Sequence, residues 1–192
     1  DFLTFSEWKL TKELQVFMKY KNENKEDVIT ALDEFGREVK RIFSRNQSNY
    51  RIQFDYDVTR TFRVRSRLEY VFVDYSNFKT SEKGILLLSD FRIKPIENLI
   101  LDWRFIVFHT DSYDSRIYEY ENDLDGVVSN PGLYGRGRRW YLLLKYKPFS
   151  YLQLSAKYSE TFLDGVKSIG SGYDEIPGDF KNRFSLQLEI EF

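Results

Sequence analysis

The last nine residues, Phe184-Ser-Leu186-Gln-Leu188-Glu-Ile190-Glu-Phe192, alternate apolar and polar side chains without interruption. Because successive side chains of a β-strand point to opposite faces, this period of two predicts a strand with one apolar and one polar face. Water-soluble domains also end on amphipathic edge strands. The choice between a membrane strand and a soluble strand therefore depends on whether the pattern repeats along the chain.

The alternation does repeat. It recurs near residues 14–20, 50–56, 62–72, 85–93, 99–107, 140–146 and 152–158. The segments 62–72, 85–93, 99–107 and 184–192 are nine to eleven residues long, whereas the mean globular strand has about five or six. A tilted strand needs about nine to eleven residues to cross a bilayer. Length and period together predict an all-β protein made of antiparallel, membrane-crossing strands.

Composition narrows the function classes. Lys and Arg number 29 against 30 Asp and Glu, so no net basic field favours nucleic acid as a partner. Mean hydropathy is −0.52 and the sequence has no long apolar run, which excludes helical membrane spans. Aromatic residues make up 18% of the chain, a share typical of the aromatic girdles of membrane barrels. With no cysteine and one histidine, we expect neither a metal nor a cofactor.

Connections between the predicted strands alternate in length. Short turns fall near 10–13, 58–61, 94–98 and 147–150, and long connections near 21–48, 75–83, 110–137 and 163–180. Outer-membrane barrels have this arrangement, with short periplasmic turns and long extracellular loops. The long connections are rich in Asp, Asn, Ser and Gly, as in 122–126, and lack the regular acidic spacing of a calcium loop. We expect them to be solvated.

The connection near 21–48 has two interpretations. Val28, Leu32, Phe35 and Val39 are spaced as on an amphipathic helix. The same stretch also fits two strands joined by a turn that contains Gly36, a residue that would cost about 1 kcal/mol inside a helix. We predict the hairpin, as strand extensions that project above the membrane.

The apolar parity is expected to face lipid, because aromatic residues bracket aliphatic ones on it: Tyr50 and Tyr56, for example, lie on either side of Ile52 and Phe54. In a lipocalin-like barrel the same parity would face inward instead. On the polar parity, the side chains predicted to line the interior are Arg51, Arg63, Arg65, Arg67, Asp90, Arg92, Asp102, Arg104, Lys145 and Lys157.

These charges allow two interpretations. The basic residues could line an anion-selective pore. They could equally form a packed interior of ion pairs, with the Arg63, Arg65 and Arg67 ladder against Asp90, Asp102 or Glu69. Side chains can fill a barrel of about eight to ten strands, whereas about sixteen strands leave a channel. The packed interior is therefore the favoured interpretation.

His109 raises the possibility of an enzyme. It follows the outward residues of a predicted strand and is close in sequence to Asp111, Ser112 and Asp114, and outer-membrane lipid hydrolases use Ser and His on the barrel wall. No nucleophile motif accompanies these residues. A rim histidine in a polar loop is the favoured interpretation, and no catalytic residue is assigned.

Three stretches resemble known proteins. Phe184, Leu186, Leu188, Ile190 and Phe192 resemble the closing strand of bacterial outer-membrane barrels, which the barrel-insertion machinery reads. The stretch Asp111–Asp123, continuing to Tyr134-Gly-Arg-Gly137, and the stretch Ile169–Gly178 are similar to the C-terminal region of Bacteroidetes envelope proteins that carry an N-terminal helix-hairpin-helix module. The second resemblance implies a barrel in a Gram-negative envelope, but transfers no functional residue. The module itself is absent from this chain.

The sequence thus predicts one domain over residues 1–192, an antiparallel up-and-down transmembrane β-barrel with about nine visible strands. Bacterial single-chain barrels have even strand numbers, so either the first strand is misread or the chain is the C-terminal part of a longer barrel protein. We favour the longer protein. The expected role is a structural or partner-binding component of the envelope, with a pore and a lipid hydrolase as alternatives. Expected partners are outer-membrane lipid, the insertion machinery, other envelope proteins or a missing N-terminal segment.

Overall fold

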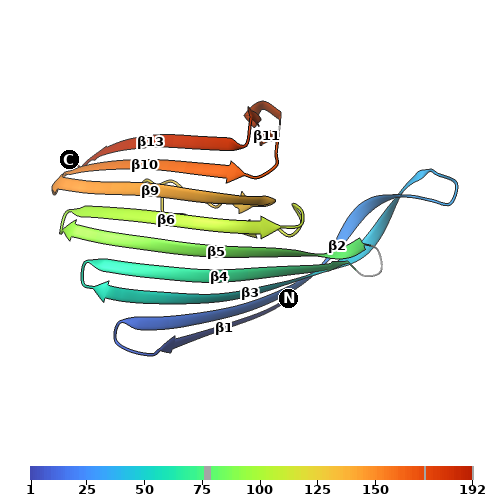
Figure 1. Ribbon diagram of the computed structural model, residues 1–192, viewed down its shortest axis with the longest axis horizontal. Coiled ribbons are helices and arrows are strands. Elements are labelled where there is room, and N and C mark those ends of the chain that lie inside the picture. The colour runs from blue at the N-terminus through green and yellow to red at the C-terminus, as the bar shows by residue number, and fades with distance from the viewer. Residues whose placement is uncertain (76–78, 171, 192) are drawn as a thin grey trace.

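In the computed structural model, which describes residues 1–75, 79–170 and 172–191, the chain folds into one large antiparallel sheet (Figure 1). Its nine strands follow the order of the sequence without a crossover. They are β1 (Phe2–Lys9), β2 (Leu14–Leu32), β3 (Glu38–Thr59), β4 (Phe62–Tyr75), β5 (Lys79–Ile96), β6 (Leu99–Thr110), β9 (Arg136–Phe149), β10 (Leu152–Leu163) and β13 (Phe180–Ile190). Short elements lie in the long connections: β7 (Ile117–Tyr118), β8 (Gly132–Leu133), β11 (Ser168–Ile169), the 3-10 turn Gly172–Asp174 and β12 (Ile176–Pro177). The all-β, up-and-down prediction is confirmed.

The two ends of the sheet differ as predicted. At one end, adjacent strands are joined across residues 10–13, 60–61, 97–98 and 150–151. At the other end lie the connections 111–135 and 164–179 and the paired extensions of β2 and β3 (Figure 1). We call these the turn end and the loop end. By the arrangement of outer-membrane barrels, the turn end is periplasmic and the loop end is extracellular.

The segment 26–44, here called the hairpin segment, is a hairpin and not a helix. β2 and β3 stay in register as far as Leu32 opposite Glu38, and the ribbon projects beyond the rest of the sheet (Figure 1). Gly36 has a φ of 74°, a value that favours glycine, and its N–H donates to the carbonyl of Asp33 over 3.0 Å. The Asp33 carboxylate also accepts the N–H groups of Phe35 and Arg37. The predicted hairpin is therefore confirmed.

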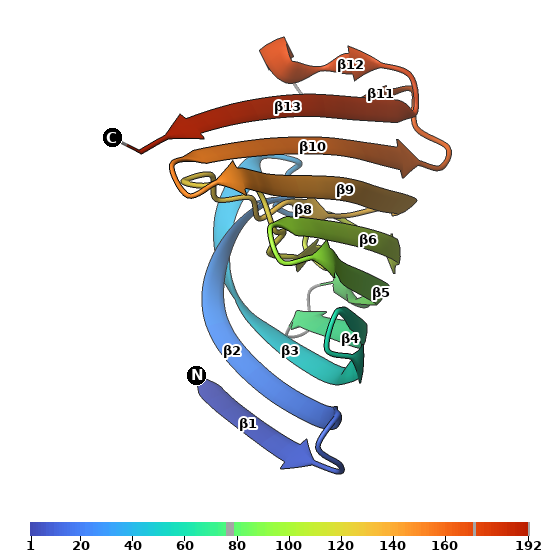
Figure 2. The same ribbon diagram turned by 90° about the vertical axis from the view of Figure 1, so that its left-hand side faces the viewer.

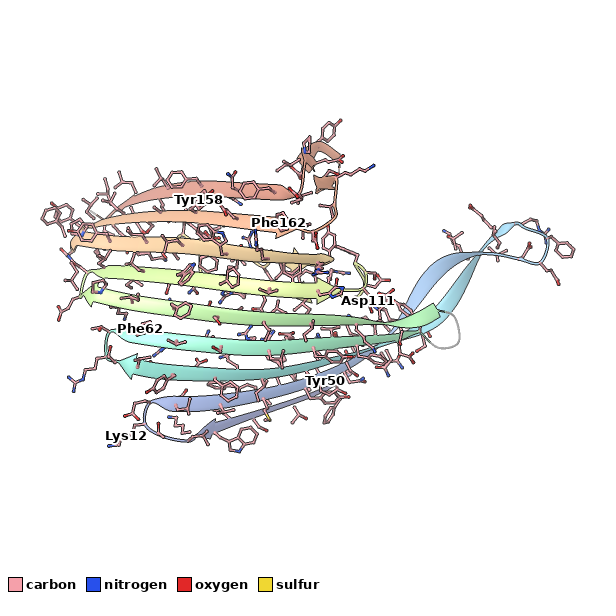
Figure 3. All side chains as sticks on the ribbon, in the orientation of Figure 1. Lys12, Tyr50, Phe62, Asp111, Tyr158 and Phe162 are labelled. Atoms are coloured by element: carbon pink, nitrogen blue, oxygen red, sulfur yellow. The ribbon has the colours of Figure 1, made fainter. Side chains whose placement is uncertain are left out.

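The sheet is curved (Figure 2). Its convex face, opposite the face that the connection 111–135 covers, carries the exposed apolar parity. Tyr50, Phe54 and Leu142 are each more than 40% exposed on this face, although they are large and apolar. Aromatic rings form two groups on it: Phe2, Tyr20, Tyr50 and Tyr70 in one, and Phe62, Phe91 and Trp103 in the other. Figure 3 shows Phe62 near the turn end and Tyr50 closer to the loop end. This is the arrangement of two interfacial girdles around an apolar band.

The sheet has two lateral edges. β1 and β13 stand at opposite ends of the strand order, and within the described residues each pairs on one side only. Because neighbouring strands alternate in direction, the first and the ninth run the same way. β1 is a regular strand whose eight residues pair with β2, so the alternative that the first strand was misread is wrong.

Within the part of the chain that the structure describes, no helix is long and apolar enough to cross a membrane.

Candidate functional site

The concave face of the sheet carries the charged side chains. Ion pairs between adjacent strands neutralise many of these charges. Arg65 lies opposite Asp55 and contacts it at 2.7 Å, and Arg92 lies opposite Asp102 at 2.6 Å. Arg104 makes the same kind of pair with Asp90. Cross-strand neighbours are close enough for such pairs without any chain crossing the interior.

The pairing differs from the one expected for the arginine ladder. Arg63 contacts Asp57 at 2.6 Å and Arg65 contacts Asp55, whereas Asp90 and Asp102 are held by Arg104 and Arg92. The expectation that the ladder meets Asp90, Asp102 or Glu69 was therefore wrong. In the strand register Arg65 lies opposite both Asp55 of β3 and Asp90 of β5, and it pairs with Asp55 because Asp90 is held by Arg104.

The connection 111–135, here called the plug segment, lies against the concave face instead of extending away from the sheet (Figure 2). It is a hairpin of its own, in which β7 pairs with β8 and Glu121 bridges to Ser129. Ser115, Ile117, Glu119 and Glu121 are fully buried. The expectation that the Asp- and Glu-rich connection 110–137 is solvated was therefore wrong.

Glu119 is the acidic centre of this contact. Its side chain is 0% exposed, and both carboxylate oxygens accept from Nη1 of Arg67, at 2.7 and 2.6 Å. Nη2 of Arg51 lies 3.5 Å from the same carboxylate and Nη1 of Arg104 lies 3.9 Å from it. Arg104 also donates to the carbonyl of Tyr120 over 2.6 Å. Arg67, which lacks an acidic neighbour on β3, thus finds one in the plug segment.

Further along the plug segment, every second residue is acidic and forms ion pairs with basic side chains of β9 and β10. Glu121 accepts from Nε and Nη2 of Arg139 at 2.5 and 2.8 Å and lies 3.2 Å from Nζ of Lys157. Lys157 also contacts Asp123 at 2.7 Å, and Lys145 contacts Asp125 at 2.5 Å. Burial opposes ionisation of Glu121, but the hydrogen bonds and charges of Arg139 and Lys157 outweigh it and hold its pKa below the usual range.

Toward the loop end the contact is apolar. Val71, Val73, Leu86, Ile106 and Phe108 of the wall pack with Ile117 and Leu133 of the plug segment. At Gly84 of β5 the approach is very close, since a Cβ there would lie 2.5 Å from the carbonyl oxygen of Ser115. On β4, β5 and β6 the concave face near the loop end is thus apolar, unlike the polar face that was expected. Apolar side chains are stable there because the plug segment, and not water, covers them.

The remaining concave surface is basic. A groove of about 270 Å³ beside the plug segment is lined by Lys19, Lys21, Lys25, Arg45, Arg51 and Arg116, with Glu23, Glu69 and Asp114 as its acidic residues. The lysines of β2 were missed at the level of sequence. The alternation of lysines at 19, 21 and 25 was the available signal. In the register of β2 and β3 these lysines lie on the same face of the sheet as Arg51.

The structure does not assemble a hydrolytic centre around His109. His109 is exposed on the convex face, whereas Ser112 Oγ donates to Glu82, whose side chain faces the interior. Asp111 accepts from the backbone N–H of Lys83, and Asp114 accepts from Tyr75. Among the described residues, no hydrogen bond joins His109 to Ser112, and no group of His, Cys, Asp and Glu could hold a metal ion.

The residues of the predicted insertion signal lie at the far edge of the sheet. Phe184, Leu186, Leu188 and Ile190 share one face of β13, each at least 46% exposed. Phe192 lies outside the described residues.

Comparisons with known proteins bear on the fold. No protein-family model matches the sequence, and no curated protein matches it. OmpT (in-vitro folded), an outer membrane protein of Vibrio cholerae, is similar in structure with a TM-score of 0.55 and 12% identity, over 94% of this chain and 52% of that one. A NanC porin structure has a TM-score of 0.46 and 8% identity, over 99% and 92%. This chain thus spans about half the length of the Vibrio protein.

The fold is that of an outer-membrane β-barrel. An identity of 12% supports the fold alone, but the fold carries an exposed apolar convex face framed by aromatic rings. In water such a face would be costly, whereas in hydrocarbon it is the lipid-facing surface of a barrel wall. The protein is therefore an integral component of the bacterial outer membrane.

Proposed function

We propose that this protein is a structural, partner-binding component of the outer membrane whose interior is closed by its own plug segment. The buried contact of Glu119 with Arg67 carries the proposal. A buried carboxylate paired on several sides is costly to separate from its partners, so the plug segment is a fixed part of the wall. A closed interior supports anchoring and assembly as the role of the protein. It does not support free diffusion of solutes through the barrel.

The hairpin segment is the surface that supports partner binding. Leu32, Phe35 and Ile42 are each more than 65% exposed on a ribbon that projects beyond the loop end. Exposed apolar side chains grouped outside the membrane are typical of protein-binding surfaces. Other envelope proteins are the partners that such a position favours.

Conductance tests the closed interior. The full-length protein, reconstituted in planar bilayers, should show no sustained conductance steps, and the doubly substituted Glu119→Gln, Glu121→Gln protein should show them because its plug segment loses its anchors. A matched control, Glu26→Gln with Glu34→Gln in the hairpin segment, should stay silent. Steady steps from the unsubstituted protein would overturn the proposal.

The basic groove favours a second candidate, an anion-selective pore. Lys19, Lys21 and Arg45 line this groove beside the plug segment. If the unsubstituted protein conducts, the groove predicts anion preference that falls or reverses when Lys19 and Lys21 become Glu. Changing Arg65 and Arg67 to Glu tests the arginine ladder in the same assay.

We also propose that further strands complete the wall. Unpaired backbone groups at the edges of β1 and β13 cannot be left in hydrocarbon, and two edge strands of the same direction need an odd number of additional strands for antiparallel closure. The longer Vibrio barrel supports this view. The likeness of Asp111–Asp123 and Ile169–Gly178 to Bacteroidetes helix-hairpin-helix envelope proteins supports an N-terminal part of that type.

Disulfide trapping tests the additional strands, because the chain has no native cysteine. Cysteine at Glu7 of β1 should form no bond with cysteine at Ser185, Gln187 or Glu189 of β13 in the membrane-inserted protein. Cysteines at the register partners Ile52 and Leu68 should form one and serve as the control. A β1–β13 disulfide would show direct closure of nine strands and contradict the proposal.

For the terminal strand, we propose recognition by the barrel-insertion machinery. The exposed apolar face formed by Phe184, Leu186, Leu188 and Ile190 supports it. Replacing Leu186 and Leu188 by Ser should slow insertion in a reconstituted assay while spontaneous folding into detergent is retained. The same double change at the outward residues Leu142 and Leu144 is the control.

A further inference from the structure

The convex face has an apolar groove near the loop end, between β5, β6, β9 and β10. Leu87, Phe105 and Val107 form its floor, and its volume is about 510 Å³. All three side chains are more than a third exposed, so the groove opens toward the hydrocarbon. A flat barrel wall needs no such depression to meet lipid.

Basic groups line the end of this groove that is nearest the loop end. His109 and Arg136 are opposite each other in the register of β6 and β9, and Arg138 is opposite Val107. Arg136 is the first residue of β9 and His109 is the penultimate residue of β6, so both lie at the rim of the wall. The apolar floor extends from there toward the turn end.

Acidic neighbours offset only part of this charge. Nε of Arg136 lies 3.4 Å from Asp164, and both side chains are more than half exposed. Within the described residues Arg138 forms no ion pair, and its guanidinium lies 4.8 Å from the ring centroid of Phe162. Figure 3 shows Phe162 nearer to the loop end than Tyr158 on the same strand. Stacking on a ring leaves the N–H groups of Arg138 available to an anion.

The aromatic residues next to the groove indicate at which depth in the membrane the groove lies. Trp140 and Tyr158 lie 5.5 Å apart between ring centroids. Trp140 is one same-face position closer to the turn end than Arg138, and Tyr158 is two such positions closer than Phe162. Both donate to Glu160, which is thereby already engaged. Trp and Tyr with bound polar groups are typical of the membrane interface. His109, Arg136 and Arg138 are therefore at the level of the lipid headgroups.

We propose that this groove binds a phosphorylated lipid of the outer leaflet. One acyl chain lies over Leu87, Phe105 and Val107, and the headgroup phosphate accepts hydrogen bonds from Arg136 and Arg138. His109 supplies a further N–H donor. Guanidinium groups match phosphate oxygens in geometry, and an apolar floor that continues from the cations selects an anion that carries a chain.

This inference rests on the membrane position of the convex face and not on the closed interior. A conducting protein with an intact lipid site, or a silent protein without one, would separate the two proposals. The lipid site also gives the expected partner, outer-membrane lipid, a defined place on the wall.

Native mass spectrometry of the full-length protein in neutral detergent tests the site. The probes are phosphatidylglycerol and a diacylglycerol with the same chains, which lacks the phosphate. The unsubstituted protein should bind phosphatidylglycerol at least about tenfold more tightly than diacylglycerol, and Arg136→Gln with Arg138→Gln should remove about tenfold or more of that preference. Arg37→Gln with Arg60→Gln removes the same charge far from the groove and should change nothing.

The acyl chain is tested separately. Val107→Trp should fill the groove and weaken both lipids, and glycerol 3-phosphate, the headgroup without chains, should bind at least about tenfold more weakly than phosphatidylglycerol. Heat-modifiable gel migration confirms that each variant is folded. Equal binding of the two lipids by the unsubstituted protein, equal losses in the two arginine double variants, or equal binding of glycerol 3-phosphate would each overturn the proposal.

Discussion

The plug segment and the hairpin segment are both long, charged connections at the loop end, yet one packs against the concave face and the other projects into solvent. The hairpin segment continues the register of β2 and β3, so its backbone hydrogen bonds are satisfied without the rest of the protein. The plug segment contains only the short pair β7 and β8, and its carboxylates find partners on the wall. Whether a connection packs against the wall or projects into solvent thus depends on where its polar groups can be paired.

The largest expected difference between the segments concerns buried charge. Replacing Glu119 by Gln leaves Arg67 without its anionic partner in a dry contact, and we expect a loss of about 3–5 kcal/mol in the free energy of unfolding. Guanidinium unfolding of the protein refolded in micelles measures it. Glu34→Gln at the exposed tip of the hairpin segment should cost no more than about 0.5 kcal/mol. Equal losses would mean that the plug segment is not anchored by charge.

Close packing should give the next effect. Gly84→Val places a Cβ 2.5 Å from the Ser115 carbonyl in the unrelaxed structure, so the plug segment must shift, at a cost of about 1–3 kcal/mol. Added protease should then cut within 111–135. Ser89→Val, on the outward parity of the same strand, is the matched control and should leave the plug segment resistant. Resistance in both variants would contradict the close approach.

A pH effect should follow from Glu121. Because its pKa is lowered in the folded protein, its contribution to stability is complete above the ordinary carboxyl value of 4.5 and is lost as the pH falls through the lower, folded value. We expect cleavage of the plug segment to increase as the pH falls below the ordinary carboxyl value. Glu121→Gln should be cleaved already at neutral pH and respond less to acid. A pH-independent pattern in the unsubstituted protein would exclude this contribution.

The sequence was sufficient for the wall. Alternation at 50–56 and 184–190 and the unequal connections predicted the strands, the outward face and the two ends of the barrel. It was insufficient for the plug segment, because a period of two in Glu119, Glu121, Asp123 and Asp125 is also what a solvated loop contains. Deciding between them requires the partners, and Arg67, Arg139, Lys157 and Lys145 come from strands distant in sequence. The charge of a connection could be interpreted only after the wall was known.

The smallest expected effect completes the comparison, at the turn of the hairpin segment. The Asp33 carboxylate accepts hydrogen bonds there from the N–H groups of Phe35 and Arg37 and from Nε of Arg37. All are local and solvent-exposed, so Asp33→Ala should lower global stability by less than about 1 kcal/mol. Faster amide hydrogen exchange at Phe35 and Arg37 is its main expected sign. If Asp33→Ala instead destabilised the protein as strongly as Glu119→Gln, the hairpin segment would have to be coupled to the wall, and its independence from the rest of the sheet would be disproved.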